Sequence, residues 1–241
     1  MTKPMEGLEG KRILVTGAAS GIGAATVAFL TESGCRVAGL DRQAGQAVTA
    51  VADVSSWDEV ARAVSEAAQA IGGFDGAVNA AGIGGYTGDV TETAPSAWEK
   101  VIGVNLTGVF LVSRAVIPFL RKSGAGCIVN VSSQYGLVGG AAFPAYIAAK
   151  AGVIGLTKAM AVDHAPEGIR VNCVCPGPIN TPMLAASAAQ TKEPERARAR
   201  VLLGKPGEPQ DVAALVAFLL SDQARNMTGS IVPTDGGWTA S

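Results

Sequence analysis

A glycine-rich turn between a predicted strand and a predicted helix constrains this fold more than any other segment. The apolar run at residues 12–15 is followed by Thr16-Gly17-Ala18-Ala19-Ser20-Gly21-Ile22-Gly23. In such a turn the first glycine permits a sharp change of direction, the second lets the backbone approach a ligand, and the third lets the helix pack against the sheet. Because free N–H groups at a helix N-terminus attract anions, the segment predicts a site for the pyrophosphate of a dinucleotide.

Apolar runs typical of buried strands alternate with helical patterns along the chain. The predicted strands cover residues 12–16, 36–40, 48–52, 75–79, 126–131, 169–175 and 230–233. The predicted helices cover about 21–33, 56–71, 102–122, 145–165 and 209–220. No linker divides the chain, so we expect a single-domain α/β fold with a doubly wound parallel sheet of about seven strands and helices on both faces. Between Asp41 and Asp53 there is room for only a loop and a short strand, so the crossover helix expected there is missing or a single turn.

Composition argues against several function classes. A net charge of −1 gives no electrostatic basis for binding nucleic acid or an anionic membrane surface. Residues 123–149 carry no charge, but Asn130, Gln134, Pro144 and five glycines make them a poor membrane-spanning helix. The segment Met1–Glu6 lacks the apolar core of a signal peptide, so we expect a cytoplasmic protein.

The cysteines and the histidine predict no metal site. The four cysteines, at positions 35, 127, 173 and 175, lack the spacing of metal ligands, and we interpret them as small buried residues. The one histidine, His164, precedes Pro166 near the end of a predicted helix, and no nucleophile elbow accompanies it.

Tyr146 and Lys150 are four residues apart, so they share one face of a helix. A lysine charge about 4 Å from a phenol is worth roughly 4 kcal/mol in an effective dielectric of ~20, which would lower the phenol pKa by up to ~3 units. The pair therefore predicts an acid–base catalyst. Ser133 ends an apolar run at the C-terminal edge of a predicted strand, where open parallel sheets bind ligands. Ser132 is the alternative, since only one of the two can face the cleft.

Together these residues resemble the short-chain dehydrogenase/reductase family over nearly the whole chain. The matching pieces are the Thr-Gly-x-x-x-Gly-Ile-Gly turn at 16–23, Asn79-Ala80-Ala81-Gly82, Asn105, Ser133, the Tyr146/Lys150 pair and Pro176-Gly177. The resemblance implies a Rossmann-like, nicotinamide-dependent oxidoreductase domain at residues 1–241, with a substrate lid at about 178–205.

The resemblance implies catalytic roles for four residues. Tyr146 would be the acid/base, Lys150 would lower its pKa and bind ribose, and Ser133, favoured over Ser132, would orient the substrate. Asn105 matches the asparagine that helps hold a water leading to the lysine, although a helix N-cap is an alternative reading.

Further residues are implied to hold the dinucleotide. Where the family usually carries a second asparagine, this chain has Ala80. Asp53-Val54 resembles the pair that meets the adenine, Pro176-Gly177 with Thr181 resembles the loop that clamps the nicotinamide, and Asp235-Gly236-Gly237 resembles a structural closing turn. The expected cofactor contacts are Gly17, Ser20, Gly21, Ile22, Gly23, Asp41, Arg42, Asp53, Val54, Asn79, Ala81, Gly82, Tyr146, Lys150, Pro176, Gly177, Ile179 and Thr181.

Two residues bear on the choice of cofactor. Asp41 ends the second predicted strand, where a carboxylate binds the ribose hydroxyls of NAD and repels a 2′-phosphate. Arg42 could compensate that repulsion, but Ser20 stands where phosphate-using relatives often carry a basic residue. We therefore expect NAD rather than NADP.

The substrate pocket is predicted from position alone. Its candidate walls are Ser133, Gln134, Phe143, Tyr146, Met183 and Leu184. Arg196, Arg198 and Arg200 near the lid are offset by two glutamates and are interpreted as a solvated face. The leading interpretation is an NAD-dependent enzyme that interconverts a small secondary alcohol and a ketone, assembled as a homotetramer through the helices at 102–122 and 145–165. The alternatives are an NADPH-dependent reductase of 3-oxoacyl thioesters and a non-catalytic dinucleotide-binding regulator.

Overall fold

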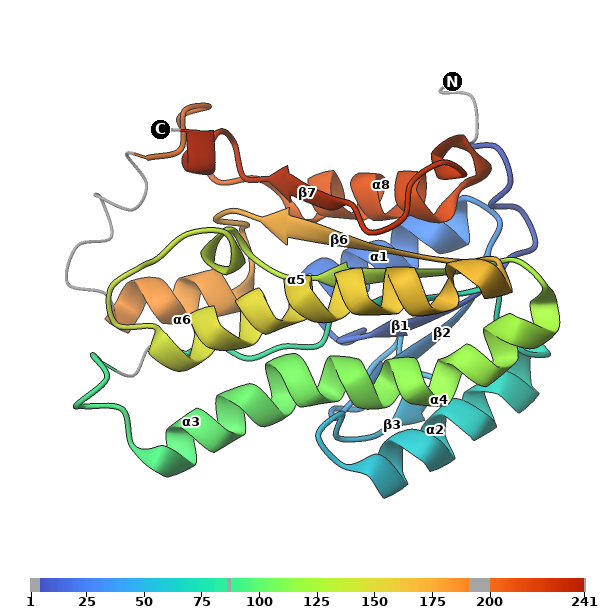
Figure 1. The fold of residues 1–241 in the computed structure, drawn as a ribbon, viewed down its shortest axis with the longest axis horizontal. Helices are drawn as coiled ribbons and strands as arrows, with labels where there is room; N and C mark the ends of the chain where they lie inside the picture. Colours follow the sequence, from blue (N-terminus) through green and yellow to red (C-terminus); the bar gives the residue numbers. More distant parts are fainter. Residues whose placement is uncertain (1–4, 86–87, 191–199, 241) are drawn as a thin grey trace.

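Seven parallel strands form one sheet in the order β3-β2-β1-β4-β5-β6-β7 in the computed structural model, which describes residues 5–85, 88–190 and 200–240 (Figure 1). The strands are β1 (Arg12–Thr16), β2 (Arg36–Asp41), β3 (Ala50–Val51), β4 (Gly76–Asn79), β5 (Gly126–Val131), β6 (Ile169–Pro176) and β7 (Ile231–Thr234). Strand order runs outward in opposite directions from β1 and β4, so a crevice opens at the C-terminal ends of these two strands. The predicted doubly wound parallel sheet is confirmed.

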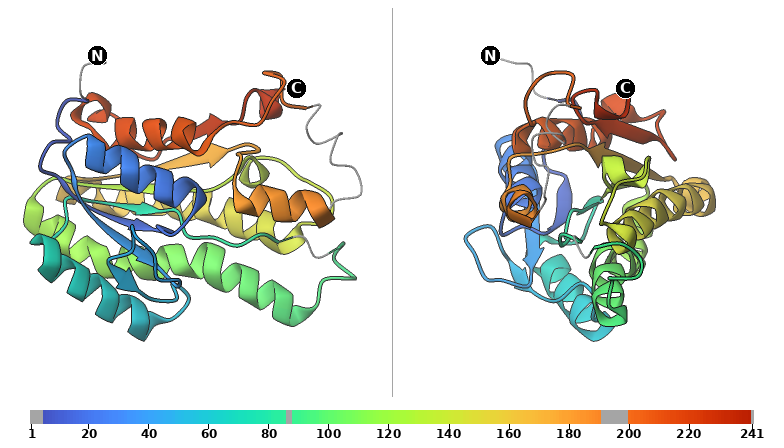
Figure 2. Two further views of the ribbon diagram at one scale, coloured as in Figure 1. Left: turned by 180° about the vertical axis from the view of Figure 1, so that it is seen from behind. Right: turned by 90° about the vertical axis from the view of Figure 1, so that its left-hand side faces the viewer.

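Helices cover both faces of the sheet. One layer contains α1 (Gly21–Glu32) and α8 (Pro209–Leu220), and the other contains α2 (Trp57–Ile71), α4 (Gly108–Ser123) and α5 (Pro144–His164). Figure 1 shows α5 and α4 in front of the sheet, and the left view of Figure 2 shows α1 and α8 from the opposite side. The remaining helices, α3 (Pro95–Ile102) and α6 (Pro182–Gln190), lie beyond the C-terminal ends of the strands.

Alternation along each strand explains the two layers. In β1, Ile13 and Val15 belong to the apolar cluster formed with α1 and α8, whereas Leu14 belongs to the cluster formed with α2 and α4. All three side chains are completely buried. A parallel strand that is covered on both faces must be apolar at successive positions, which is why the strands appear in the sequence as continuous apolar runs.

Two predicted elements differ in extent. The helix expected at 102–122 begins earlier, at Pro95, and a π-helical turn at Gly103–Thr107 joins α3 to α4. The strand expected at 48–52 is only Ala50–Val51, and residues 42–49, all described, contain no helix. The shortened crossover is therefore confirmed. Helix α6 was not predicted.

Two long helical stretches, Pro95–Ser123 and Pro144–Glu167, are apolar enough to cross a membrane by length and composition alone. In the structure, half of the first stretch's most apolar window is buried inside the protein, and α4 and α5 pack on the sheet. Core packing therefore accounts for the apolar side chains that these two helices bury. The uncharged stretch 123–149 is not one helix, since it contains β5, a 3₁₀ turn at Gln134–Gly136 and the start of α5.

Candidate active site

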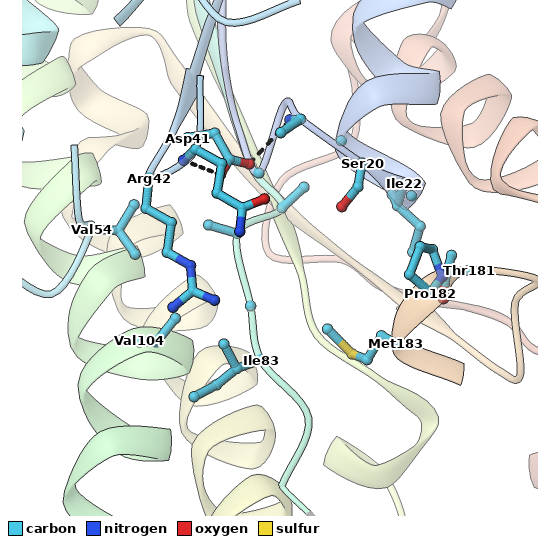
Figure 3. Close-up of a pocket in the computed structure, with 18 of the residues that line it drawn as sticks. Ser20, Ile22, Asp41, Arg42, Val54, Ile83, Val104, Thr181, Pro182 and Met183 are labelled. Carbon is cyan, nitrogen blue, oxygen red and sulfur yellow. Dashed lines mark hydrogen bonds between the residues drawn. The ribbon is translucent and has the colours of Figure 1, made fainter. Parts of the chain in front are cut away.

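A cavity of about 230 Å³ lies at the C-terminal ends of β1, β2 and β4 (Figure 3). Its walls come from the glycine-rich turn, the end of β2, the segment after β4 and the start of α6. Twelve of the residues predicted for the dinucleotide line it: Gly17, Ser20, Gly21, Ile22, Gly23, Asp41, Arg42, Asp53, Val54, Ala81, Gly82 and Thr181. The cavity lies where open α/β sheets bind their ligands.

The glycine-rich turn leaves no room for a side chain at Gly17 or at Gly23. Gly17 has a positive φ of 72°, and a Cβ there would lie 2.9 Å from the Ala81 nitrogen. A Cβ on Gly23 would lie 2.0 Å from the Gly17 carbonyl oxygen. Ser20, at the N-cap of α1, makes no capping hydrogen bond with its side chain, so the first turn of the helix is not closed by it. This cradle suits a pyrophosphate.

The Asp41 carboxylate is fixed toward the cavity. Its Oδ2 accepts a hydrogen bond from the Ala19 backbone at 3.0 Å, and its Oδ1 accepts one from the Gln43 backbone at 3.0 Å (Figure 3). Arg42 lines the same cavity, and its side chain extends beside Val104. A carboxylate and a guanidinium thus line the same cavity, which is where an adenosine ribose would lie.

Asp53 forms the far rim of this cavity. Its carboxylate accepts hydrogen bonds from the hydroxyl and the backbone nitrogen of Ser55, which hold its pKa below the ordinary value, and the Arg42 charge acts in the same direction. The rim is therefore negatively charged at neutral pH.

Ser133, Tyr146 and Lys150 meet at the end of β5. Ser133 follows the strand, and Tyr146 lies in the first turn of α5, where both residues line one cavity and the Ser133 hydroxyl acts to lower the Tyr146 pKa. Lys150 lies one turn further, with its Nζ 5.6 Å from the centroid of the tyrosine ring. The same Nζ donates to the backbone carbonyl of Val131 at 2.9 Å.

The structure also shows that the adjacent residues Ser132 and Ser133 have different surroundings. The Ser132 hydroxyl is buried and donates to the Lys150 backbone carbonyl at 2.8 Å, so it ties β5 to α5. Ser133 lines a cavity instead. Strand alternation thus leaves Ser133 as the residue that faces the pocket.

The predicted lowering of the Tyr146 pKa by Lys150 is wrong for this structure. Burial raises the Tyr146 pKa to about 12, and the Ser133 hydroxyl only partly opposes this. Burial also lowers the Lys150 pKa to about 8. The reason is geometric, since the ammonium lies over the tyrosine ring and is hydrogen-bonded to a carbonyl.

Asn105 lies inside the π-helical turn, completely buried, so the alternative reading as a helix N-cap is wrong. Its Oδ1 accepts from the Ile83 nitrogen at 3.2 Å, and its Nδ2 donates to the carbonyls of Ile83 and Val101 at 3.2 and 3.0 Å. Asn105 therefore fixes the segment after β4. A Cβ on Gly82 would lie 2.8 Å from Asn105 Oδ1 and 3.7 Å from Lys150 Nζ, which brings all three residues together.

A second cavity, of about 190 Å³, adjoins the first. All six predicted substrate residues line it, namely Ser133, Gln134, Phe143, Tyr146, Met183 and Leu184. Thr181 and Met183 line both cavities, so the two spaces share one wall from the start of α6. No charged side chain lines the second cavity among the residues that the structure describes.

A family model described as enoyl-(acyl carrier protein) reductase matches residues 17–239. The chain belongs to the short-chain dehydrogenase/reductase family. It is 42% identical to cis-4-hydroxycyclohexanecarboxylate dehydrogenase from Sinomonas cyclohexanicum, over 94% of this chain and 96% of that protein. It is 40% identical to 3-oxoacyl-[acyl-carrier-protein] reductase from Thermotoga maritima, over 95% and 98%. The structure of an aldohexose dehydrogenase from Thermoplasma acidophilum superposes with a TM-score of 0.90 at 32% identity, over 97% and 96% of the two chains.

As a short-chain dehydrogenase/reductase, this protein is an oxidoreductase that acts on alcohols and ketones. The geometry nevertheless leaves five predicted cofactor residues outside both cavities: Asn79, Lys150, Pro176, Gly177 and Ile179. The Asn79 amide turns into the core, where Nδ2 donates to Asn130 Oδ1 at 2.8 Å and to Ser113 Oγ at 3.1 Å. A Cβ on Gly177 would lie 2.6 Å from the Asp235 Cα, so this residue serves close packing with the closing turn.

Several lining residues of this short-chain dehydrogenase/reductase were not predicted. In the first cavity they are Ala19, Gln43, Ala52, Ala80, Ile83, Val104 and Pro182, and in the second Gly84, Gly85, Tyr135, Pro178, Ser187, Ala188 and Pro206. Most are small or apolar, and only their place after strand ends could have indicated them. Pro182 is an exception, because a threonine before a proline predicts a helix start, and Thr181 Oγ1 accepts from the Leu184 nitrogen at 3.3 Å.

The remaining predictions have mixed outcomes. Arg196 and Arg198 lie outside the described residues, whereas the Arg200 guanidinium stacks 3.8 Å from the centroid of the Trp238 ring. His164 ends α5 and its Nδ1 lies 3.0 Å from Glu167 Oε2, consistent with a helix-end residue. Within the described residues, no three His, Cys, Asp or Glu side chains gather as metal ligands, and all four cysteines are buried.

Proposed function

We propose that this protein is an NAD-dependent enzyme that interconverts a small, uncharged secondary alcohol and its ketone. One observation carries the proposal. The apolar cavity that holds Ser133 and Tyr146 shares Thr181 and Met183 with the first cavity, so a substrate oxygen at Tyr146 would lie next to the end of a cofactor bound there. The Gly17–Gly23 cradle and the fixed Asp41 carboxylate fit a dinucleotide.

A bound nicotinamide would supply the hydride acceptor or donor. The chain's own residues then handle the oxygen and its proton. With its pKa at about 12, Tyr146 is neutral at pH 7 and can donate a proton to the carbonyl oxygen during reduction, which leaves a phenolate. In the direction of oxidation, this phenolate form accepts the proton of the alcohol. The Ser133 hydroxyl, which lines the same cavity as the phenol, orients that oxygen.

Lys150 and Asn105 support this pair. The Lys150 ammonium lies 5.6 Å from the centroid of the Tyr146 ring, and its hydrogen bond to the Val131 carbonyl holds this part of α5 at the end of β5. Asn105 positions the segment from Gly82 to Ile83 through three hydrogen bonds, and this segment separates the lysine from the first cavity. We assign it a positioning role.

Asp41 supports NAD over NADP. A 2′-phosphate beside this carboxylate would meet a like charge, and the two backbone hydrogen bonds prevent the carboxylate from turning away. Arg42 is the residue that supports the alternative, since its guanidinium lines the same wall.

The second cavity supports a compact neutral substrate. Its volume of about 190 Å³ exceeds the roughly 150 Å³ that accommodates benzene in a protein core, so a six-membered ring fits. The names of two similar proteins point to a cyclic alcohol and to an acyl thioester. The cavity favours the former, because none of its described lining residues carries the positive charge that would attract a phosphopantetheine arm.

We also propose a homotetramer. Phe110 on α4 and Val162 on α5 are 46% and 75% exposed, and a Cβ on Gly155 would touch nothing within 4 Å, so these helices present an open apolar face. Light scattering at micromolar concentration should report four chains per particle. A monomer would contradict this assembly.

The function is tested with a panel of secondary alcohols and ketones, followed by NADH and NADPH absorbance in both directions. We expect turnover of small cyclic or branched alcohols with NAD. Turnover restricted to NADPH and 3-oxoacyl thioesters would favour the thioester reductase. Tight dinucleotide binding without any turnover would favour the regulator.

A further inference from the structure

Gln134 carries an unpaired buried acceptor at the wall of the second cavity. The residue is only 5% exposed and lines the cavity directly after Ser133. Its Oε1 is buried and has no hydrogen-bond partner among the residues that the structure describes. Buried polar atoms without partners are rare and costly, so such an atom beside an active site calls for an explanation.

The fold does not explain this amide. The backbone carbonyl of Gln134 already accepts from the nitrogens of Leu137 and Val138, at 2.9 and 3.1 Å, and so completes the 3₁₀ turn without the side chain. An apolar residue of similar size would fill the same space and leave no acceptor unpaired. Two other buried side-chain atoms lack partners in the described residues, Asn79 Oδ1 and Trp238 Nε1, and neither residue lines the second cavity.

We propose that the Gln134 side chain turns toward the cavity that it lines, and that its Oε1, buried and unpaired in this structure, accepts a hydrogen bond from a second hydroxyl group of the substrate, so that the preferred substrates are diols and hydroxyketones. This inference rests on the proposed function, in which Ser133 and Tyr146 hold the reacting oxygen. Because Gln134 directly follows Ser133 and both line the same cavity, we assign the second hydroxyl to the carbon next to the reacting one. The cavity walls supply apolar surface for the rest of the molecule.

Because Oε1 can only accept a hydrogen bond, it would favour some substrate groups over others. A hydroxyl can donate a proton to it, whereas an ether oxygen, a second carbonyl and a carboxylate cannot. A site built to hydrogen-bond a substrate group discriminates strongly against analogues that lack the group, because the protein's own polar atom is then left unpaired. Gln134 would thus determine specificity without taking part in proton transfer.

The test compares cyclohexane-1,2-diol, cyclohexanol and 2-methoxycyclohexanol with the full-length enzyme and NAD. The methoxy compound keeps the second oxygen and its bulk but has no proton to donate. We expect kcat/KM for the diol to exceed that for each of the other two by about tenfold or more, the range of one unpaired buried group. Equal efficiency with the diol and the methoxy compound would overturn the inference.

Substitution of Gln134 tests whether its side-chain amide causes the preference for the diol. In Gln134→Met the diol preference should shrink to about twofold or less, because the acceptor is gone while the volume is kept. Gln69→Met makes the same chemical change on the exposed face of α2, outside both cavities, and should keep the preference of the wild type. A Gln134→Met enzyme that keeps the full preference would also overturn the inference.

A binding measurement separates this inference from the proposed function. Calorimetry of the diol and the methoxy compound with the enzyme does not require hydride transfer. Preferential diol binding without turnover would contradict the proposed function and leave the role of Gln134 standing. Turnover of all three alcohols with equal affinities would support the proposed function and refute the role of Gln134.

Discussion

Gly85 lies so close to Tyr146 that a Cβ on Gly85 would stand 2.5 Å from the Cβ of the tyrosine. The segment after β4 therefore packs directly against the first turn of α5, at the wall of the second cavity. The backbone of Gly85 does not have a positive φ, so contact with Tyr146, and not backbone strain, excludes a side chain there.

We expect Gly85→Ala to displace Tyr146 and to reduce kcat at least tenfold, since small misplacements of a catalytic group can cost about 10²-fold. Gly139→Ala is the matched control, because a Cβ there would meet nothing within 4 Å. Steady-state kinetics and thermal unfolding of both variants distinguish the two sites. A fully active Gly85→Ala enzyme would show that the tyrosine can move without loss.

Tyr146→Phe removes the transferable proton and keeps the ring that packs near Phe143, whose ring centroid lies 6.4 Å away. The loss in kcat should be about 10²–10⁴, the range for a positioned acid–base group. NADH binding, measured by fluorescence titration, should remain near that of the wild type. If the variant retains more than about a tenth of kcat, another group transfers the proton.

Asp41 should give NAD an advantage of at least about tenfold in kcat/KM, since a unit charge near a 2′-phosphate costs several kcal/mol. Asp41→Ala should narrow this advantage, mainly by raising KM for NAD through loss of the ribose contacts. Asp58→Ala, in the first turn of α2 and outside the cavity, is the matched control. Equal use of NAD and NADP by the wild type would mean that Arg42 outweighs the carboxylate.

Lys150 should make stability depend on pH. Its pKa is about 8 in the folded protein, below the ordinary 10.5, so between these values the unfolded chain holds a proton that the folded protein has lost. The free energy of unfolding therefore rises with pH in this window, and the contribution disappears as the pH falls through 8. Relative to Lys150→Met, the wild type should gain about 2 kcal/mol between pH 7.5 and 9.5.

Urea unfolding of the cofactor-free proteins at the two pH values measures this difference. The raised pKa values of Tyr146 and Cys127 affect both proteins, so they largely cancel in the comparison. Lys158→Met, on the exposed face of the same helix, is the matched control and should show no such pH dependence. A constant difference for Lys150→Met would mean that the lysine is not desolvated.

The sheet could be predicted because each strand is apolar on both faces and each crossover begins or ends at a recognisable turn. The missing helix after Asp41 followed from chain length alone, and the structure has only Ala50–Val51 there. The glycine-rich turn and the Tyr146/Lys150 spacing indicated two parts of the candidate site. Both could be predicted because they depend only on residues that are close together in the sequence.

What could not be predicted depends on contacts between distant segments. The tyrosine pKa depends on where the Lys150 ammonium lies, and its partner, the Val131 carbonyl, is 19 positions away in the sequence. Asn79 could equally have faced the cofactor, but Asn130 and Ser113 draw its amide inward. The unpaired Gln134 acceptor has no signature in the sequence, because it depends on the absence of a hydrogen-bond donor near Oε1 among the described residues of the folded protein.

Because Gly103–Thr107 forms a π-helical turn, the number of residues in this segment determines where Asn105 points. Removing one residue there would allow an uninterrupted α-helix with regular hydrogen bonds, yet it would rotate α3 by about 100° relative to α4. Asn105 would then leave Ile83, and the segment beside Lys150 would lose its anchor. The irregular π-helical turn thus keeps the Asn105 amide against Ile83. Insertions and deletions in this segment should therefore be far less tolerated than substitutions.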